Sequence, residues 1–305
     1  MIFIKRKVIL HGPSTLTISL PAKWVKSHNI VKGDELNVED ASNILRIYPG
    51  EERLLEKGIK ADFSNFDYET IRVMMSVFYE SGYDKVEVAF KDPATANVIQ
   101  EAISPTLLGY EIVEQRKNAC IVKNVSGDHL SELDALIRRA FLVTLSLADN
   151  SLEQLESGQT AKLKELLVLE KTNNKLTNYS HRLMNKKPSK EQGVIYTYLV
   201  VWVFESICDD YRDLIKLILS KKNLRFSHAF LEAYREINNL LKQYYSLFYK
   251  YSDDEFMKLR KSILELKGNF LKKKFSDQEG ELRYFLFSIL NRLYDCLGST
   301  IGMHH

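Results

Sequence analysis

The sequence of 305 residues predicts a multidomain α+β protein with three successive parts. Residues 1 to about 50 alternate apolar and hydroxylated side chains between turn signals, which indicates short strands. Strand and helix patterns then alternate over residues 54–125, which is typical of a small α/β unit. From residue 128 to residue 302, apolar side chains recur at spacings of three and four, so we expect helices throughout.

Composition limits the classes of protein to which the chain can belong. Its 43 Lys and Arg side chains against 40 Asp and Glu leave a net charge of +3, too small to indicate nucleic-acid binding by itself. Cys120, Cys208 and Cys296 are far apart and lack zinc or disulfide spacing, which favours a reducing, cytoplasmic location. The longest apolar run, residues 194–204, is well short of the ~20 residues that span a bilayer, so we expect no membrane insertion.

The first part of the chain contains about four short strands and one short helix. In order, the pattern predicts a strand over residues 15–20, a helix that begins at Pro21 and continues over residues 22–28, a turn at Gly33-Asp34, and strands over residues 36–38 and 44–48. So small a segment buries too little apolar surface to be stable alone. We therefore expect a second copy of the chain to complete its core.

Positive charge is concentrated at the N-terminus. The first 33 residues hold no acid, and their basic residues are Lys5, Arg6, Lys7, Lys23, Lys26 and Lys32. A phosphate backbone would feel this local positive field even though the whole chain is almost neutral.

Several short motifs of this segment carry a resemblance to a known family. They are Arg6-Lys7-Val8, Ile18-Ser19-Leu20-Pro21, Ile30 and Gly33-Asp34-Glu35-Leu36. In this order they resemble the AbrB/MazE-type (SpoVT-AbrB) swapped-hairpin domain. The resemblance implies that two chains interleave through residues 1–48 into one small β-barrel, and that this homodimer binds double-stranded DNA.

The same resemblance implies which residues contact DNA. In the family, basic residues before the first strand and five positions after the proline lie on DNA, and these positions hold Arg6 and Lys26 here. Thr17 and Val25 stand at two further positions that are basic in the family. Nearby lysines are candidates to compensate, so the predicted DNA-binding residues are Lys5, Arg6, Lys7, Thr17, Lys23 and Lys26. The alternative is a dimerisation module with merely solvated lysines.

The second part is expected to be a structural connector. Its predicted strands cover residues 58–64, 83–90, 110–115 and 118–125, and its predicted helices cover residues 67–82 and 94–103. It contains no glycine-rich phosphate loop and no cluster of acids with histidine. The Met74-Met75 pair fits a hydrophobic core better than a cofactor site.

The third part carries a faint internal repeat. Its predicted helices are residues 129–156, 160–186, 190–220, 227–251, 253–273 and 278–300, with Pro188 between the second and third. The repeat consists of polar pairs four residues apart: Glu170 and Asn174, Glu205 and Asp209, Glu265 and Asn269, Asn291 and Asp295. Such spacing places both side chains of a pair on one helix face.

Two tandem three-helix repeats with such pairs resemble the PhoU family. That resemblance implies a pair of three-helix bundles with iron or zinc as the metal, and it makes Glu205, Asp209 and Asp295 the candidate metal ligands. Three of the four pairs contain an Asn, whose neutral carbonyl is a weaker ligand than a carboxylate. The alternative is a polar seam that fixes the register of the helices.

These observations predict a DNA-binding transcriptional regulator rather than an enzyme. The sequence has no Ser/His/Asp order, no Walker loop and no zinc-protease motif. We expect a DNA-binding domain over residues 1–50, a connector over residues 54–125 and a PhoU-like sensing or docking domain over residues 128–302. The resemblance to archaeal-type phosphate uptake regulators implies a link to phosphate uptake. The alternative function is a signalling adaptor that docks on a phosphate transporter or a sensor kinase, with the barrel serving only for dimerisation.

Overall fold

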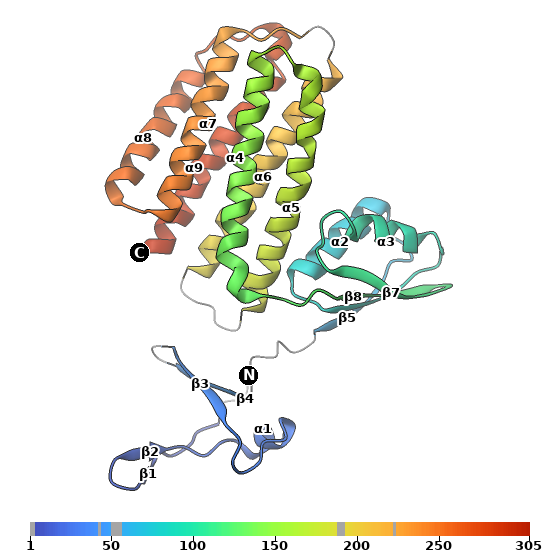
Figure 1. Ribbon diagram of the computed structural model, residues 1–305, viewed down its shortest axis with the longest axis vertical. Helices are drawn as coiled ribbons and strands as arrows, with labels where there is room; N and C mark the ends of the chain where they lie inside the picture. The colour runs from blue at the N-terminus through green and yellow to red at the C-terminus, as the bar shows by residue number, and fades with distance from the viewer. Residues whose placement is uncertain (1–3, 42–43, 50–56, 188–192, 222–223) are drawn as a thin grey trace. The chain divides into compact units, whose positions relative to one another are not determined.

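The chain divides into two compact units, residues 1–55 and 56–305. The computed structural model describes residues 4–41, 44–49, 57–187, 193–221 and 224–305 (Figure 1). Strands are concentrated in the first part of the chain and long helices in the remainder, so the predicted mixture of α and β structure is confirmed.

The N-terminal unit consists of two hairpins and one short helix. Its elements are β1 (Ile9–His11), β2 (Thr15–Thr17), α1 (Ala22–Ser27), β3 (Leu36–Ala41) and β4 (Ile44–Pro49). Strands β1 and β2 pair antiparallel, as do β3 and β4, and the two pairs are separate sheets. Pro21 is the residue before α1 and has an extended backbone with ψ of 124°, so the helix begins one residue later than expected.

This unit has no hydrophobic core within one chain. Among its residues whose side chains the structure describes, none is buried. Leu16 is 68% exposed, Leu10 is 62% exposed and Val38 is 60% exposed. These apolar strands therefore need a partner surface that one chain does not supply.

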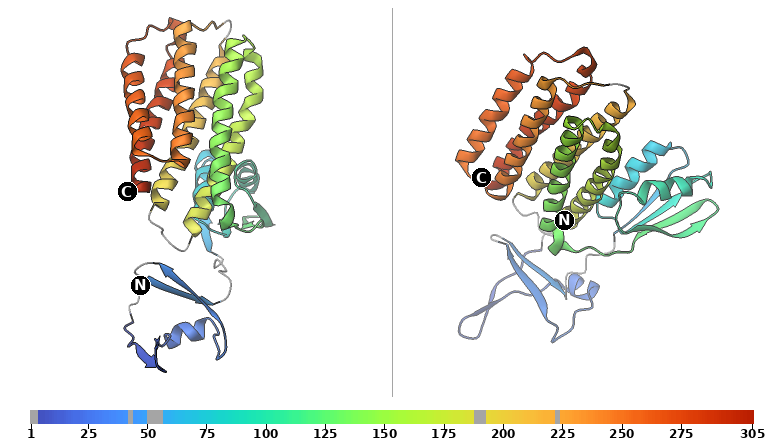
Figure 2. Two further views of the ribbon diagram at one scale, coloured as in Figure 1. Left: turned by 60° about the vertical axis from the view of Figure 1, so that its left-hand side comes forward. Right: turned by 45° about the horizontal axis from the view of Figure 1, so that its top comes forward.

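The α/β segment that follows matches its predicted elements within two residues at each end. It contains β5 (Gly58–Asp62), α2 (Tyr68–Glu80), β6 (Lys85–Ala89), α3 (Thr95–Ile103), β7 (Tyr110–Arg116) and β8 (Ala119–Asn124). The sheet order is β5-β6-β8-β7, with β5 parallel to β6 and the other pairs antiparallel. Both helices pack on one face of the sheet (Figure 2), where Met75 is fully buried, as expected for a core residue, while Met74 is half-buried.

Long helices make up the rest of the described chain. They are α4 (Leu133–Glu156), α5 (Leu163–Lys186), α6 (Val194–Ser220), α7 (His228–Tyr249), α8 (Asp253–Phe270) and α9 (Leu282–His304). Residues 130–132 and 160–162 form 3-10 turns, so α4 and α5 begin later than predicted. The predicted start of the third helix at residue 190 and the break at Pro188 lie outside the described residues.

Helix α8 ends three residues earlier than the predicted residue 273. After the helix ends, Lys273 Nζ donates to Glu232 Oε2 at 3.0 Å and to Glu236 Oε2 at 2.9 Å on α7, so the following segment is attached to that helix. Helix α9 begins four residues later than predicted, after a 3-10 turn at Asp277–Glu279, and continues four residues further, to His304.

The helices share one hydrophobic cluster, with members such as Leu147 of α4, Tyr211 of α6 and Leu286 of α9. A second cluster fills the α/β segment and includes Tyr179 and Leu183 of α5. The α/β and helical segments, treated as two domains from the sequence, thus pack as one unit. The likeness to paired three-helix bundles stays a prediction.

Candidate functional site

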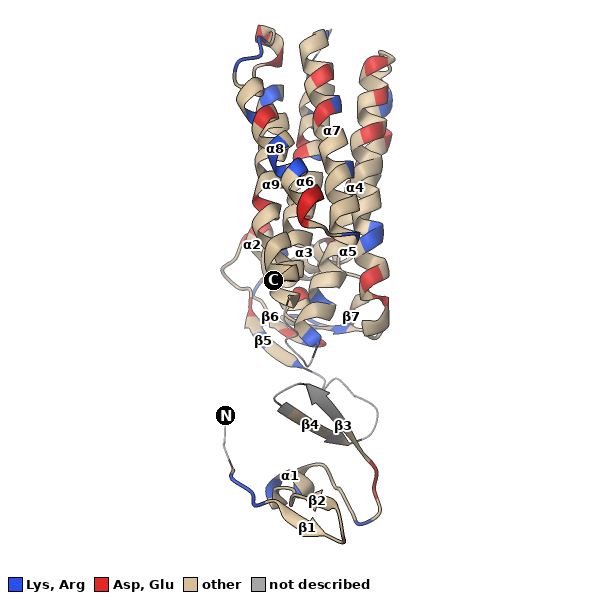
Figure 3. Cartoon of the chain, turned by 90° about the vertical axis from the view of Figure 1, so that its left-hand side faces the viewer, with Lys and Arg blue, Asp and Glu red and all other residues tan. Residues whose placement is uncertain are grey.

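The predicted DNA-binding residues are all exposed in the N-terminal unit. Lys5, Arg6 and Lys7 lie in the segment just before β1, and Lys23 and Lys26 lie on α1 (Figure 3). The three-residue spacing of the two α1 lysines places them on one side of the helix. No ion pair between described residues involves any of the five. Their charge is therefore available to a ligand.

Two polar side chains close to these cations, Thr17 and Asp34, make hydrogen bonds of their own. The hydroxyl of Thr17 donates across the first hairpin to the carbonyl oxygen of Ile9 at 3.2 Å, so its proton is used within the hairpin. Asp34, the first acid of the chain, accepts a hydrogen bond from the backbone N–H of Val31 at 2.8 Å. That bond holds the carboxylate at the turn before β3.

The first predicted metal positions lie in an acidic cluster between α5 and α6. Arg212, one turn after Asp209, donates from Nη1 to Glu170 Oε1 at 2.9 Å and also contacts the Asp209 carboxylate. Asn174 donates to the same Glu170 oxygen at 2.8 Å. A guanidinium therefore already pairs with the Glu170 and Asp209 carboxylates of this cluster.

Burial changes the protonation of this cluster. The pKa of Glu205 is raised to about 8, mainly by burial and in part by the negative charges of Asp209 and Glu80. Burial also raises the pKa of Asp209 to about 6, although Arg212 opposes the change. Glu205 is thus mostly protonated at neutral pH, and a metal ion would have to displace that proton.

The second half of the predicted repeat faces solvent. Glu265, Asn269 and Asp295 are exposed, and Glu265 has only a loose pair with Lys261 at 3.9 Å. Within the described ranges, no three His, Cys, Asp or Glu side chains gather closely enough to hold a metal ion. The structure thus does not bring Asp295 together with Glu205 and Asp209, and their role as iron or zinc ligands stays a prediction.

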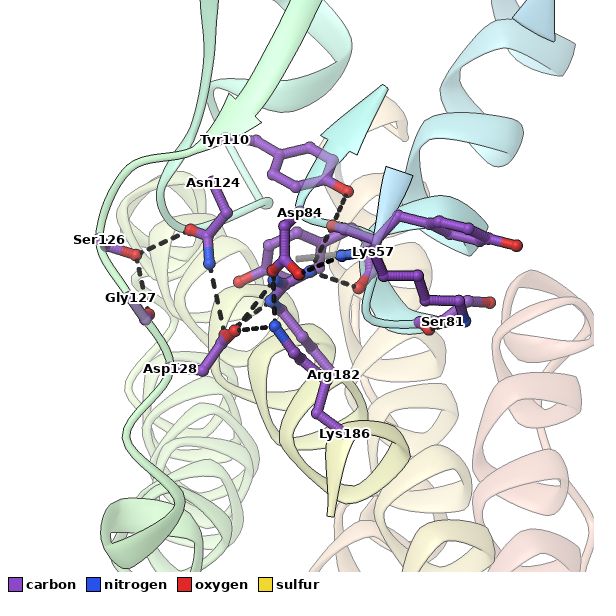
Figure 4. Close-up of polar contacts among 12 residues, drawn as sticks. Lys57, Ser81, Asp84, Tyr110, Asn124, Ser126, Gly127, Asp128, Arg182 and Lys186 are labelled. Atoms are coloured by element: carbon purple, nitrogen blue, oxygen red, sulfur yellow. Dashed lines mark hydrogen bonds and ion pairs between the residues drawn. The ribbon is translucent and has the colours of Figure 1, made fainter. Parts of the chain in front are cut away.

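A buried ion network joins the α/β segment to α5 (Figure 4). Arg182, which is fully buried, donates from Nε to Asp128 Oδ1 at 2.7 Å and from Nη2 to Asp128 Oδ2 at 3.0 Å. It also contacts the Asp84 carboxylate and donates from Nη1 to the carbonyl oxygen of Tyr83 at 2.7 Å. One side chain thereby holds the loop before β6 and the segment before α4.

A second cation balances the charge of this network. Lys186 Nζ, one turn after Arg182, lies 2.5 Å from Asp84 Oδ1 and 2.6 Å from Asp128 Oδ2. Burial by itself would raise the pKa of Asp128, but hydrogen bonds from Arg182 and Lys186 hold it below its usual value. Two cations thus face two carboxylates, and this balance suits a structural clamp better than a ligand site.

The backbone N–H of Lys57 donates to Asp84 Oδ2 at 2.9 Å, so the start of the second unit is attached to the same clamp. Sequence reasoning missed this network because Asp128 and Asp84 lie far from Arg182 in the chain. One sequence feature could have indicated it. Arg182 follows Tyr179 by three residues, so it lies on the same face of the helix as that buried side chain.

Comparison with known families supports the N-terminal assignment. Residues 11–54 match the family described as "Antidote-toxin recognition MazE, bacterial antitoxin". Searches of curated proteins and of solved structures found no match. The match confirms the MazE/AbrB-type character of this segment, and domains of this type are typically dimeric, DNA-binding and non-enzymatic. In the described part of the chain, no helix is both long and apolar enough to cross a membrane.

Proposed function

We propose that the protein is a homodimeric DNA-binding transcription regulator. The N-terminal unit contacts double-stranded DNA, and the helical unit senses a signal or docks a partner. The observation that carries the proposal is a set of exposed basic side chains, with Lys23 and Lys26 inside the segment that matches the MazE family and Lys5, Arg6 and Lys7 just before it. The first acid of the chain, Asp34, is held in a turn.

Dimerisation follows from the exposed strands of the N-terminal unit. Large apolar side chains such as Leu10 and Leu16 are more than half exposed in one chain. A second chain that pairs its own hairpins with these strands buries them and closes the open edges of two-stranded sheets. The resulting dimer presents each basic residue twice, and the same DNA can bind both copies.

The basic side chains act mainly on phosphates. A lysine ammonium is a point charge that suits a phosphate oxygen, whereas base reading requires paired donors and acceptors at fixed geometry. Lys26 therefore contributes affinity for DNA of any sequence, and we assign Arg6, in the segment before β1, to phosphate contacts as well.

A finer proposal concerns the signal. On the basis of the PhoU-like repeat of polar pairs, we propose that the regulator controls phosphate uptake. A phosphate transporter or a sensor kinase would then be the partner of the helical unit. This part rests on the resemblance alone, since no side chain in the described bundle has a geometry specific for phosphate.

A salt titration of DNA binding tests the proposal. In Arg6→Ala or Lys26→Ala, two phosphate contacts per dimer are lost, so the slope of log affinity against log salt should fall by about two units. Specific and random DNA should be affected alike. Lys117→Ala, which removes an exposed lysine of the α/β segment, is the matched control and should change nothing.

Unchanged affinity and slope in both N-terminal variants would contradict DNA binding by this unit. The unit would then serve only for dimerisation, and the adaptor function would take its place. Loss of specific binding alone would show that these side chains read bases.

A further inference from the structure

The first half of α6 exposes an apolar face. Residues 194–204 contain no charged side chain. Ile195 is 64% exposed, Leu199 is 41% exposed and Trp202 is 51% exposed. Spacings of four and three residues place these side chains on one face of the helix. We call these three residues the α6 stripe.

The orientation of α6 cannot change to hide this stripe. The opposite face of the helix contributes Val200, Val201 and Phe204 to the core, where each is at most 2% exposed. Burying the stripe would therefore expose this core face instead. An apolar surface that remains in water on a fixed helix is typical of an interaction site.

The flanks of the stripe are held rigidly. Tyr198 stacks on His181 of α5 with ring centroids 4.0 Å apart. On the other side, the Tyr196 ring lies so close to Gly302 of α9 that a Cβ there would be only 2.5 Å from it. The stripe is thus preorganised, and a partner that binds it need not order a flexible surface.

We infer that the α6 stripe contacts the same stripe of a second copy of this chain. The inference rests on the proposed function, because the N-terminal dimer already supplies the second copy. An uncharged stripe meets itself without like-charge repulsion, and a two-fold axis gives an isologous contact. With the axis near Leu199, Ile195 of one chain approaches the partner's Trp202, and the large indole is the central anchor.

The small size of the stripe is compatible with this role. Three side chains per subunit bury less area than a stable interface between free proteins requires. Tethering through the N-terminal dimer makes the second contact intramolecular, at an effective concentration in the millimolar range for short linkers. The contact then couples the two helical units to the arrangement of the N-terminal dimer.

Val168 of α5 is a matched control for the stripe. It is 60% exposed, but charged Glu165 and Lys171 lie one turn away on either side. Val168 is therefore a single exposed apolar side chain between charged residues and not part of an apolar stripe along its helix.

Fluorescence of Trp202 tests the inference in the full chain. The chain has two tryptophans, so Trp24→Phe leaves Trp202 as the single indole. We expect acrylamide to quench its emission several-fold less than that of an exposed indole. Leu199→Asp in this background should restore strong quenching, and Val168→Asp should not.

Light scattering of the same samples separates the two proposals. A monomer would overturn both the N-terminal dimer and the stripe contact. A dimer in which Trp202 is fully quenched would overturn the stripe contact and leave the proposed function intact. A shielded Trp202 that does not respond to Leu199→Asp would also overturn it.

A second variant guards against misfolding of Leu199→Asp. Because Cys120, Cys208 and Cys296 are buried, Leu199→Cys adds a single accessible thiol. Oxidation should join the two chains of a dimer covalently in Leu199→Cys and not in Val168→Cys. Equal cross-linking of both variants would contradict the inference.

Discussion

The two units of the chain bury apolar surface in opposite ways. In the N-terminal unit no described side chain is buried, and Leu16 is 68% exposed. In the second unit Tyr211, Tyr244 and Leu286 are each fully buried within one continuous cluster. One chain therefore supplies the core of the second unit, whereas in the proposed dimer the first unit depends on the concentration of a partner chain.

Charge is also used in opposite ways. The basic side chains near Arg6 and Lys26 are exposed and form none of the ion pairs among the described residues. The guanidinium of Arg182 is fully buried and satisfied by two carboxylates. Unpaired surface charge is available for binding, and paired buried charge fixes the arrangement of segments. The contrast separates the functional surface from the structural clamp.

The largest expected effect comes from removing the clamp. Arg182→Met leaves Asp84 and Asp128 with Lys186 as their remaining cation, so the free energy of unfolding of the second unit should fall by about 3–5 kcal/mol. Urea unfolding followed by helical circular dichroism measures this loss. Arg72→Met removes an arginine that is 52% exposed and pairs with Glu69, and it should change stability by less than about 0.5 kcal/mol. A loss below about 1 kcal/mol in Arg182→Met would show that the network is not a clamp.

A smaller effect, on association, is expected in the N-terminal unit. Leu16→Asp places a charge on a strand that dimerisation buries, and the dissociation constant of the dimer should rise by roughly ten- to a hundred-fold. Analytical ultracentrifugation measures that constant. The urea midpoint of the helices should stay unchanged, because the second unit has its own core. The control Leu271→Asp alters a residue that is 73% exposed at the end of α8 and should leave the dimer intact. Equal weakening by both substitutions would remove the contrast between the units.

The third expected effect is a pH dependence within the second unit. The pKa of Glu205 is raised to about 8 in the folded chain, above that of an unfolded glutamate. The folded state therefore binds more protons than the unfolded state between about pH 4.3 and pH 8, and stability falls as pH rises through this window. Glu205→Gln cannot ionise, so it should remove this decline and be more stable than the wild type at pH 8.

Unfolding curves measured from pH 5 to pH 8.5 test this expectation. Glu265→Gln is the control, because this glutamate belongs to another polar pair of the repeat and its side chain is 62% exposed. Parallel pH curves for the wild type and Glu205→Gln would show that burial does not shift this carboxyl.

Apolar periodicity determined the types and order of the described helices and of most strands, but it did not locate β1 (Ile9–His11). Alternation over residues 85–89 and helical spacing over residues 68–80 depend only on local backbone geometry. The need for a second chain could also be predicted, because so short a segment has too few apolar side chains for a core. The surface positions of Arg6 and Lys26 follow from their charge.

Tertiary structure alone decided which polar pairs are buried. Glu170 and Glu265 occupy equivalent places in the repeat, yet Glu170 is 7% exposed and Glu265 faces solvent. Spacing tells which side chains share a helix face, but the neighbouring helices determine which face turns inward. The clamp likewise joins Arg182 to Asp84 and Asp128, which are far from it in the sequence. No local sequence pattern predicts these contacts, because they form only when α5 packs against the α/β segment.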